Sequence, residues 1–339
     1  MFRRLASMAF IATLVPLVTA VPGAGAAAES YVALGDSYAS GTGTGEFIDD
    51  GSQCQRSVHA YPSLISAARG YDLNFRACSG ATIPDVTSGQ LGALSAGTAH
   101  VTISVGGNDA GFTEVLTECA LPAWASDCAG AVGGAQAFID GTLPGSLSSL
   151  YASIRAQAPN ADVVTIGYPR IFMGEDCNAA TFFSPEDEAL LNATADLINS
   201  RTAAASSAAG FTFVDPIPSF IGHAVCDSPE WLNGFSSPIS ESYHPNRAGH
   251  ADGLTPLVSG PMGAGTVSVT PDVVAAAAAS SDDQAERQRG YAASDRTVRP
   301  KEFVAPDLDS PRIKAAARAA GVDLGSRASI ERAELAARQ

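Results

Sequence analysis

The sequence predicts an α/β fold in which helices cover both faces of a parallel sheet. Short apolar stretches typical of buried strands alternate with longer segments typical of helices. Glycine-rich and polar turns directly follow the first three of these strands. Because strands that alternate with helices form parallel sheets, we expect a three-layer α/β/α sandwich with a five-stranded parallel sheet.

The individual elements follow from local composition. Buried strands are expected at residues 31–34, 72–76, 100–105, 162–166 and 211–214. Helices are expected near residues 60–69, 134–157 and 185–208. The last of these begins at Ser184-Pro185 and continues with three acidic residues, which is typical of a helix N-terminus.

The first 28 residues have the pattern of a signal peptide. Arg3 and Arg4 precede an apolar run from Leu5 to Val21, and small residues follow it. A transmembrane anchor is the alternative, but the run is short for a bilayer and leads into two A-x-A cleavage patterns. We therefore expect export, with residues 1–28 removed and the mature protein secreted to the extracellular medium.

Charge divides the rest of the chain near residue 265. The net charge is −15, which argues against nucleic acid as a partner. Residues 29–264 contain no lysine and form the expected main domain. Residues 265–339 hold 11 basic and 11 acidic residues, and helices are expected at 312–320 and 328–338. We expect this part to be a flexible or partly helical extension; a small docking or surface-attachment segment is the alternative.

Six cysteines are consistent with an exported protein. No C-x-x-C pair is present, so zinc binding and thioredoxin-like chemistry are not indicated. The even number favours three disulfides, and pairing between neighbours is the simplest of the 15 possible connectivities. These cysteines are Cys54, Cys78, Cys119, Cys128, Cys177 and Cys226.

Four short stretches carry the candidate chemistry. Three of them directly follow predicted strands, at the edge of the sheet where active sites of such folds form. The glycines near the first stretch miss both the nucleophile-elbow and the dinucleotide-binding spacing, because position 39 is alanine and position 46 is glutamate. The stretches are Gly35-Asp36-Ser37, Cys78-Ser79-Gly80, Gly106-Gly107-Asn108-Asp109 and His244-Pro245-Asn246.

In these stretches the chain resembles the SGNH hydrolase superfamily, the GDSL lipases and esterases, over residues 30–262. Ser37, Gly80, Asn108 and His244 match the four residues that name the superfamily, in the same order. The resemblance implies a flavodoxin-like sandwich and a secreted bacterial lipase or esterase. It also implies that Ser37 is the nucleophile, that His244 is its general base, and that the oxyanion hole comprises the amides of Ser37 and Gly80 with the side chain of Asn108.

Elementary chemistry supports these roles. A serine hydroxyl becomes a good nucleophile only when a base removes its proton, and an imidazole titrates near neutral pH. The sequence leaves open which group orients the imidazole. The superfamily usually has aspartate three residues before the histidine, whereas this chain has Glu241. Glu241 is therefore a possible third triad member, and the backbone carbonyl of residue 241 or 242 is its competitor.

The expected substrate is a small-molecule or lipid ester. No metal-ligand spacing is present, no cofactor is required, and we expect a monomer without stable membrane insertion. A carbohydrate-ester deacetylase, a phospholipase and a non-enzymatic exported binding protein are the alternatives. Apolar residues that could line an acyl groove or belong to the core are Phe47, Phe112, Ile171, Phe172, Met173, Phe182 and Phe183.

Overall fold

The computed structural model describes residues 27–338. Five parallel strands form one sheet in the order β2-β1-β3-β4-β5, which confirms the predicted fold class. The strands are β1 (Ser30–Gly35), β2 (Asp72–Phe75), β3 (His100–Ser104), β4 (Asp162–Ile166) and β5 (Thr212–Val214). All but the last two residues of the expected signal peptide lie outside the described part of the chain.

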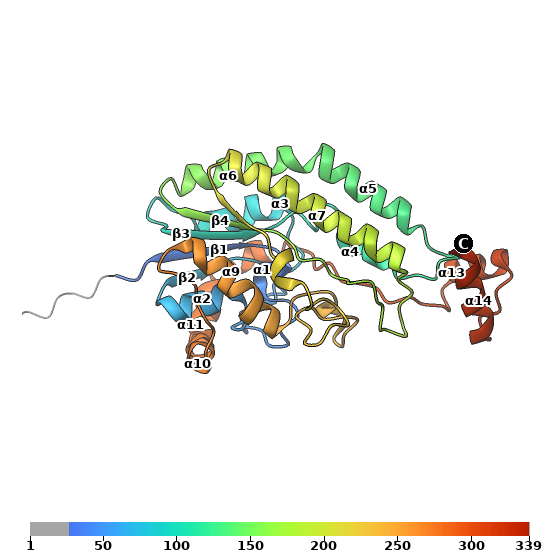
Figure 1. Ribbon diagram of the computed structural model, residues 1–339. Coiled ribbons are helices and arrows are strands. Elements are labelled where there is room, and N and C mark those ends of the chain that lie inside the picture. The colour runs from blue at the N-terminus through green and yellow to red at the C-terminus, as the bar shows by residue number, and fades with distance from the viewer. Residues whose placement is uncertain (1–26, 339) are drawn as a thin grey trace, which may run out of the picture.

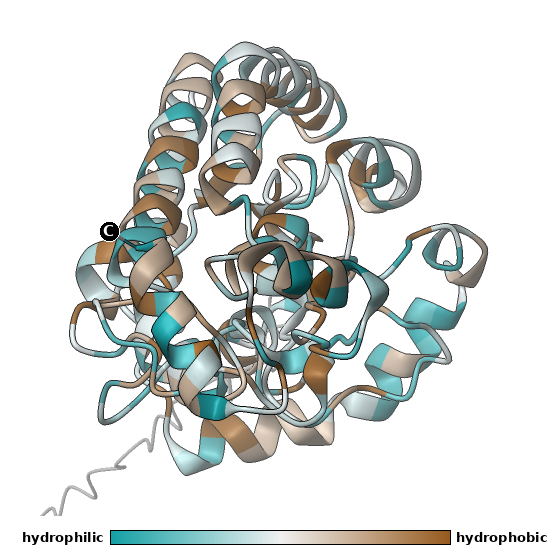
Figure 2. Ribbon diagram, turned by 90° about the vertical axis from the view of Figure 1, so that its right-hand side faces the viewer, coloured by the Kyte–Doolittle hydropathy of each residue, from teal (hydrophilic) through white to brown (hydrophobic). Residues whose placement is uncertain are grey.

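Helices cover both faces of this sheet (Figure 1). Along β1, Tyr31 and Ala33 join one apolar cluster and Val32 and Leu34 join the other, as the alternation of side chains along a strand requires. In Figure 2 apolar and polar segments alternate along the helices, as expected for helices with one buried face. One layer contains α5 (Cys128–Gly141), α6 (Leu143–Gln157) and α7 (Pro185–Ala208); the other contains α2 (Tyr61–Arg69), α9 (Thr255–Ser259), α10 (Pro271–Ala279) and α11 (Ser281–Arg289).

One predicted helix is in fact two. Residues 134–157 were expected to form a single helix, but α5 ends at Gly141 and α6 begins at Leu143. Pro144 lies in the first turn of α6, where its missing N–H costs nothing, whereas inside a continuous helix it would break the hydrogen-bond ladder. The apolar pattern continues across this break, which is why the sequence suggested one element.

Gly35 brings the end of β1 against β3. Its φ is +125°, and a Cβ at this position would lie 2.3 Å from the carbonyl oxygen of Ser104. Only glycine permits both the backbone conformation and the close approach. The residue that directly precedes Asp36 and Ser37 is thus held tightly to the neighbouring strand.

The cysteines form three disulfides between neighbours in the sequence. Cys54 pairs with Cys78, Cys119 with Cys128, and Cys177 with Cys226. This is the simplest of the connectivities that the sequence allowed. Within residues 27–338, no helix combines the length and apolar character needed to cross a bilayer.

Residues 265–338 contain five helices and cross the main domain. The C-terminal helices α13 (Pro311–Ala320) and α14 (Arg327–Ala337) lie at the opposite end of the molecule from α10 and α11 (Figure 1). Between them, after the short α12 (Ala292–Asp295), the chain runs without helix or strand to residue 310. The composition of this part suggested a flexible or partly helical extension. It did not indicate the long-range packing, because the partners of Asp295 and Phe303 lie far away in the sequence.

Candidate active site

Ser37 lies at the carboxyl edge of the sheet, in the first turn after β1. It begins the short helix α1 (Ser37–Ser40), and Asp36 caps this helix by accepting a hydrogen bond from the amide of Tyr38 at 3.0 Å. Gly41 ends the helix in the left-handed conformation. This tight turn fixes the Ser37 side chain at the point where β1 and β3 end.

The imidazole of His244 joins Ser37 to a backbone carbonyl. Its Nε2 lies 2.8 Å from the Ser37 Oγ, and its Nδ1 lies 2.8 Å from the carbonyl oxygen of Ser242. A carbonyl oxygen can only accept, so Nδ1 carries the proton and donates to Ser242. Nε2 is then the acceptor for the Ser37 hydroxyl. This tautomer is the one in which the imidazole can remove the hydroxyl proton.

The surroundings of His244 keep the imidazole neutral. Burial lowers its pKa to about 4, although the hydrogen bond to the Ser242 carbonyl favours the protonated form. At neutral pH the ring is therefore unprotonated at Nε2 and able to accept a proton. The ring of Tyr38 packs against it at a tilt, with ring centroids 5.2 Å apart.

Glu241 does not reach His244. Its side chain is largely buried beside Gly45, and burial raises its pKa. Within the described residues, the proton of Nδ1 is taken by the Ser242 carbonyl and no hydrogen bond links Glu241 to the imidazole. Of the two arrangements that the sequence left open, the structure thus contains the one with the carbonyl of residue 242.

Gly80 follows β2 and Asn108 follows β3, the two strands on either side of β1. Asn108 lines the pocket at Ser37, and its Nδ2 donates to the carbonyl of Ala81 at 3.0 Å, which orients the amide and leaves its second N–H available. Gly80 has a φ of +85°. The backbone amides of Ser37 and Gly80 donate to no acceptor within residues 27–338. Unpaired donors beside a nucleophile are what a developing oxyanion requires.

Tyr168 connects the turns that hold Ser37 and Asn108, and the sequence analysis missed it. Its hydroxyl donates to Asp36 Oδ2 at 2.6 Å and accepts from the amide of Gly107 at 3.1 Å. Burial raises the pKa of Asp36 to about 7. Its position in the sequence could have indicated it. Tyr168 follows the fourth strand, just as Ser37, Gly80 and Asn108 follow the first three. Asp109 holds its own loop to the preceding one by accepting from the amide of Ile83.

A mostly apolar pocket opens beside Ser37 and His244. Of the seven residues suggested for an acyl groove, Phe112 lines this pocket, whereas Ile171, Phe172 and Phe183 are buried in the core and Met173 is 47% exposed. Two further lining residues come from the C-terminal part of the chain. The principal side chains of the wall are Phe112, Leu116, Ile139, Ile198, Lys301 and Phe303.

One group of potential metal ligands occurs within the described residues. It consists of Cys177, Cys226 and Glu230. The two cysteines are joined in a disulfide, so neither can offer the thiolate that a metal ion would need.

Comparisons with known proteins agree with this geometry. Residues 33–251 match the model of the GDSL-like lipase/acylhydrolase family. The chain is 44% identical to Lipase 1 of Streptomyces coelicolor over 252 residues, which are 74% of this chain and 92% of that protein. It is 42% identical to a lipase of Streptomyces rimosus over 234 residues, 68% of this chain and 86% of that protein.

Two solved structures are similar over the same extent. The extracellular lipase from Streptomyces rimosus superposes with a TM-score of 0.65 at 40% identity, covering 68% of this chain and 99% of that one. Phospholipase A1 from Streptomyces albidoflavus NA297 has the same TM-score and identity, covering 69% and 99%. In both cases nearly the whole of the neighbour is matched, while a large part of this chain is not.

Proposed function

The chain belongs to the GDSL-like lipase/acylhydrolase family, and from this premise we propose that it is an exported lipase that cleaves carboxylic esters through an acyl-enzyme on Ser37. The observation that carries this proposal is the 2.8 Å contact between Ser37 Oγ and His244 Nε2 beside an apolar pocket. We infer that residues 29–264 hold the groups that carry out the reaction, and that residues 265–339 are attached to this domain.

The reaction has two steps. His244 Nε2 takes the proton of Ser37 as Oγ attacks the ester carbonyl carbon, and the resulting oxyanion accepts from the amides of Ser37 and Gly80 and from Asn108 Nδ2. The protonated imidazole then gives its proton to the departing alcohol. Water, activated by the same imidazole, attacks the acyl-enzyme and releases the carboxylic acid and free Ser37.

The third catalytic element is the backbone carbonyl of Ser242. It holds the Nδ1 proton and so the tautomer in which Nε2 is the base, and its dipole stabilises the imidazolium that forms during attack. A carbonyl carries no net charge, so it raises the basicity of the imidazole less than a carboxylate would. This agrees with the low pKa of His244.

The substrate is a lipid ester. The apolar wall next to Ser37 suits an acyl chain and offers little to a sugar ring, which disfavours the carbohydrate-ester alternative. The related Streptomyces proteins are named lipases, and one structural neighbour is a phospholipase A1, so phospholipid esters are the second candidate. Export is supported by the leader pattern of residues 1–28 and by the extracellular description of a relative.

Hydrolysis of p-nitrophenyl esters from acetate to palmitate tests the proposal. The wild type is expected to hydrolyse the series, and Ser37→Ala is expected to lose all measurable turnover. Ser207→Ala, which changes an exposed serine of α7, is the matched control and should retain full activity. Failure of the wild type on every ester, or an active Ser37→Ala variant, would contradict the proposal.

A further inference from the structure

The chain between residues 296 and 305, which we call the strap, crosses the active site from one helical layer to the other. It leaves α12 beside β2 and reaches α4 (Phe112–Cys119), whose residues form part of the pocket wall. The family match ends at residue 251, so the strap lies outside the part of the chain that defines the family.

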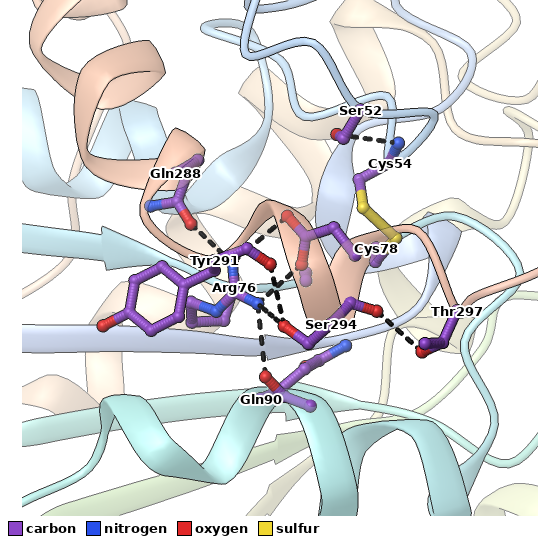
Figure 3. Close-up of polar contacts among 12 residues, drawn as sticks. Ser52, Cys54, Arg76, Cys78, Gln90, Gln288, Tyr291, Ser294 and Thr297 are labelled. Atoms are coloured by element: carbon purple, nitrogen blue, oxygen red, sulfur yellow. Dashed lines mark hydrogen bonds and ion pairs between the residues drawn. A yellow bond between two sulfur atoms is a disulfide. The ribbon is translucent and has the colours of Figure 1, made fainter.

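A buried ion cluster fixes the start of the strap. Asp295 accepts from Arg56 at 2.8 Å and from Arg76 at 2.6 Å, and the three side chains are at most 3% exposed. Figure 3 shows Gln288, Tyr291 and Ser294 around Arg76, which donates to Gln288 at 2.7 Å. Removing one partner from buried ion pairs such as these is strongly destabilising, so the cluster anchors α12 on the main domain.

Contacts with α4 and the turn that follows it fix the end of the strap. Lys301 forms an ion pair with Glu114, and the amide of Val304 donates to Thr117 Oγ1 at 3.1 Å. Further on, Arg312 donates to Glu118 at 2.8 Å. These contacts place the end of the strap on α4, at the wall of the pocket.

Between its two ends the strap touches the catalytic groups. A Cβ on Gly80 would lie 2.2 Å from the carbonyl oxygen of Arg299, so the strap packs directly on the glycine of the oxyanion hole. Lys301 and Phe303 line the pocket at Ser37. The ring of Phe303 is only 4% exposed and packs on Tyr243, with ring centroids 4.9 Å apart, immediately before His244.

We propose that the strap is part of the substrate site and that Phe303 determines which acyl-chain lengths the enzyme accepts. This rests on the proposed ester hydrolysis. The ring of Phe303 closes the pocket on the strap side, so a smaller side chain there lengthens the space for the acyl chain and a larger one shortens it. The strap, which lies outside the residues that match the family, thereby sets the preference for acyl-chain length. The four catalytic residues carry out the reaction but do not set this preference.

Chain-length profiles of strap variants test this inference in the full-length protein. The quantity measured is the ratio of kcat/KM for p-nitrophenyl decanoate to that for p-nitrophenyl butyrate. Phe303→Ala is expected to raise this ratio by about 10-fold or more, and Phe303→Trp to lower it, since small changes in an apolar pocket discriminate by about that factor. Phe303→Leu should raise the ratio as well, but by less than Phe303→Ala. It replaces Phe303→Ala as the test if that variant does not fold.

The neighbouring residue provides the control. Val304 is 60% exposed and does not line the pocket, so Val304→Ala should leave the ratio at the wild-type value. If the wild type hydrolyses both esters but the Phe303 variants keep its ratio within twofold, the strap proposal is wrong and the proposed function stands. If the wild type hydrolyses no ester, the proposed function fails and the strap proposal fails with it.

Discussion

The carbonyl oxygen of Ser242 lies 2.8 Å from Nδ1 of His244, while Nε2 on the other side of the ring lies 2.8 Å from Ser37 Oγ. The hydrogen-bond partner of Nδ1 in this structure is therefore part of the backbone. It cannot be removed by substituting a side chain and does not titrate. The side chain that the sequence offered for this role, Glu241, lies beside Gly45 instead and forms no hydrogen bond with His244 within the described residues.

Glu241→Gln should retain kcat/KM within about threefold of the wild type. Glutamine keeps the size and shape of the side chain, and the contact between His244 and Ser242 does not involve the residue 241 side chain. His244→Ala, measured beside it, should be inactive. A loss of about 10⁴ in kcat for Glu241→Gln, as expected when a triad carboxylate loses its charge, would show that Glu241 orients the imidazole.

The pH dependence of kcat/KM should have its acid limb near pH 4. Imidazole acts as a base only when neutral, so activity is present above the pKa of His244, about 4, and falls as the pH drops through it. The pKa of nearby Asp36 is about 7, and Asp36→Asn would remove any inflection that its titration contributes. An acid limb near pH 6.5 that persists in Asp36→Asn would contradict the effect of burial on His244.

Asn108→Ala should lower kcat by about 10² to 10³ without unfolding the protein. The amide is held by the carbonyl of Ala81 and lies in the pocket at Ser37, so its removal deletes one oxyanion donor while Ser37 and His244 remain. Asn160→Ala, at an exposed turn, is the comparison. Equal turnover by the two variants would exclude Asn108 from the oxyanion hole.

Asp295→Asn should destabilise the protein by about 3–5 kcal/mol in urea unfolding, because it leaves Arg56 and Arg76 buried with less countercharge. The exposed Asp283→Asn on α11 should change the free energy of unfolding by less than about 0.5 kcal/mol. If both substitutions have the same small effect, α12 is not anchored on the main domain by this ion cluster.

Local pattern was sufficient for much of the fold and for the candidates Ser37, Gly80, Asn108 and His244, whose roles remain proposals. The strands are short apolar runs, and Ser37, Gly80 and Asn108 follow three of them directly, so their positions at one edge of the sheet could be expected before any coordinates were known. The role of the Ser242 carbonyl could only be offered as an alternative, because it depends on the path of the loop before His244.

The contribution of the C-terminal part could not be predicted for a different reason. Asp295 meets Arg56 and Arg76 across more than 200 residues of sequence, and Phe303 meets Tyr243 across about 60. Contacts of this kind have no periodicity or spacing that marks them. Mixed charge and alanine-rich composition looked the same as in a solvated extension, although Lys301 and Phe303 line the pocket at Ser37.

The central claim is that His244 activates the hydroxyl of Ser37, and covalent labelling tests it most directly. Diisopropyl fluorophosphate, followed by peptide mass spectrometry, should place a single phosphoryl adduct on the peptide containing Ser37 and abolish esterase activity in parallel. His244→Ala should remain unlabelled, because without the base Ser37 is an ordinary serine. Labelling at another serine, or equal labelling of Ser37 with and without His244, would contradict the account.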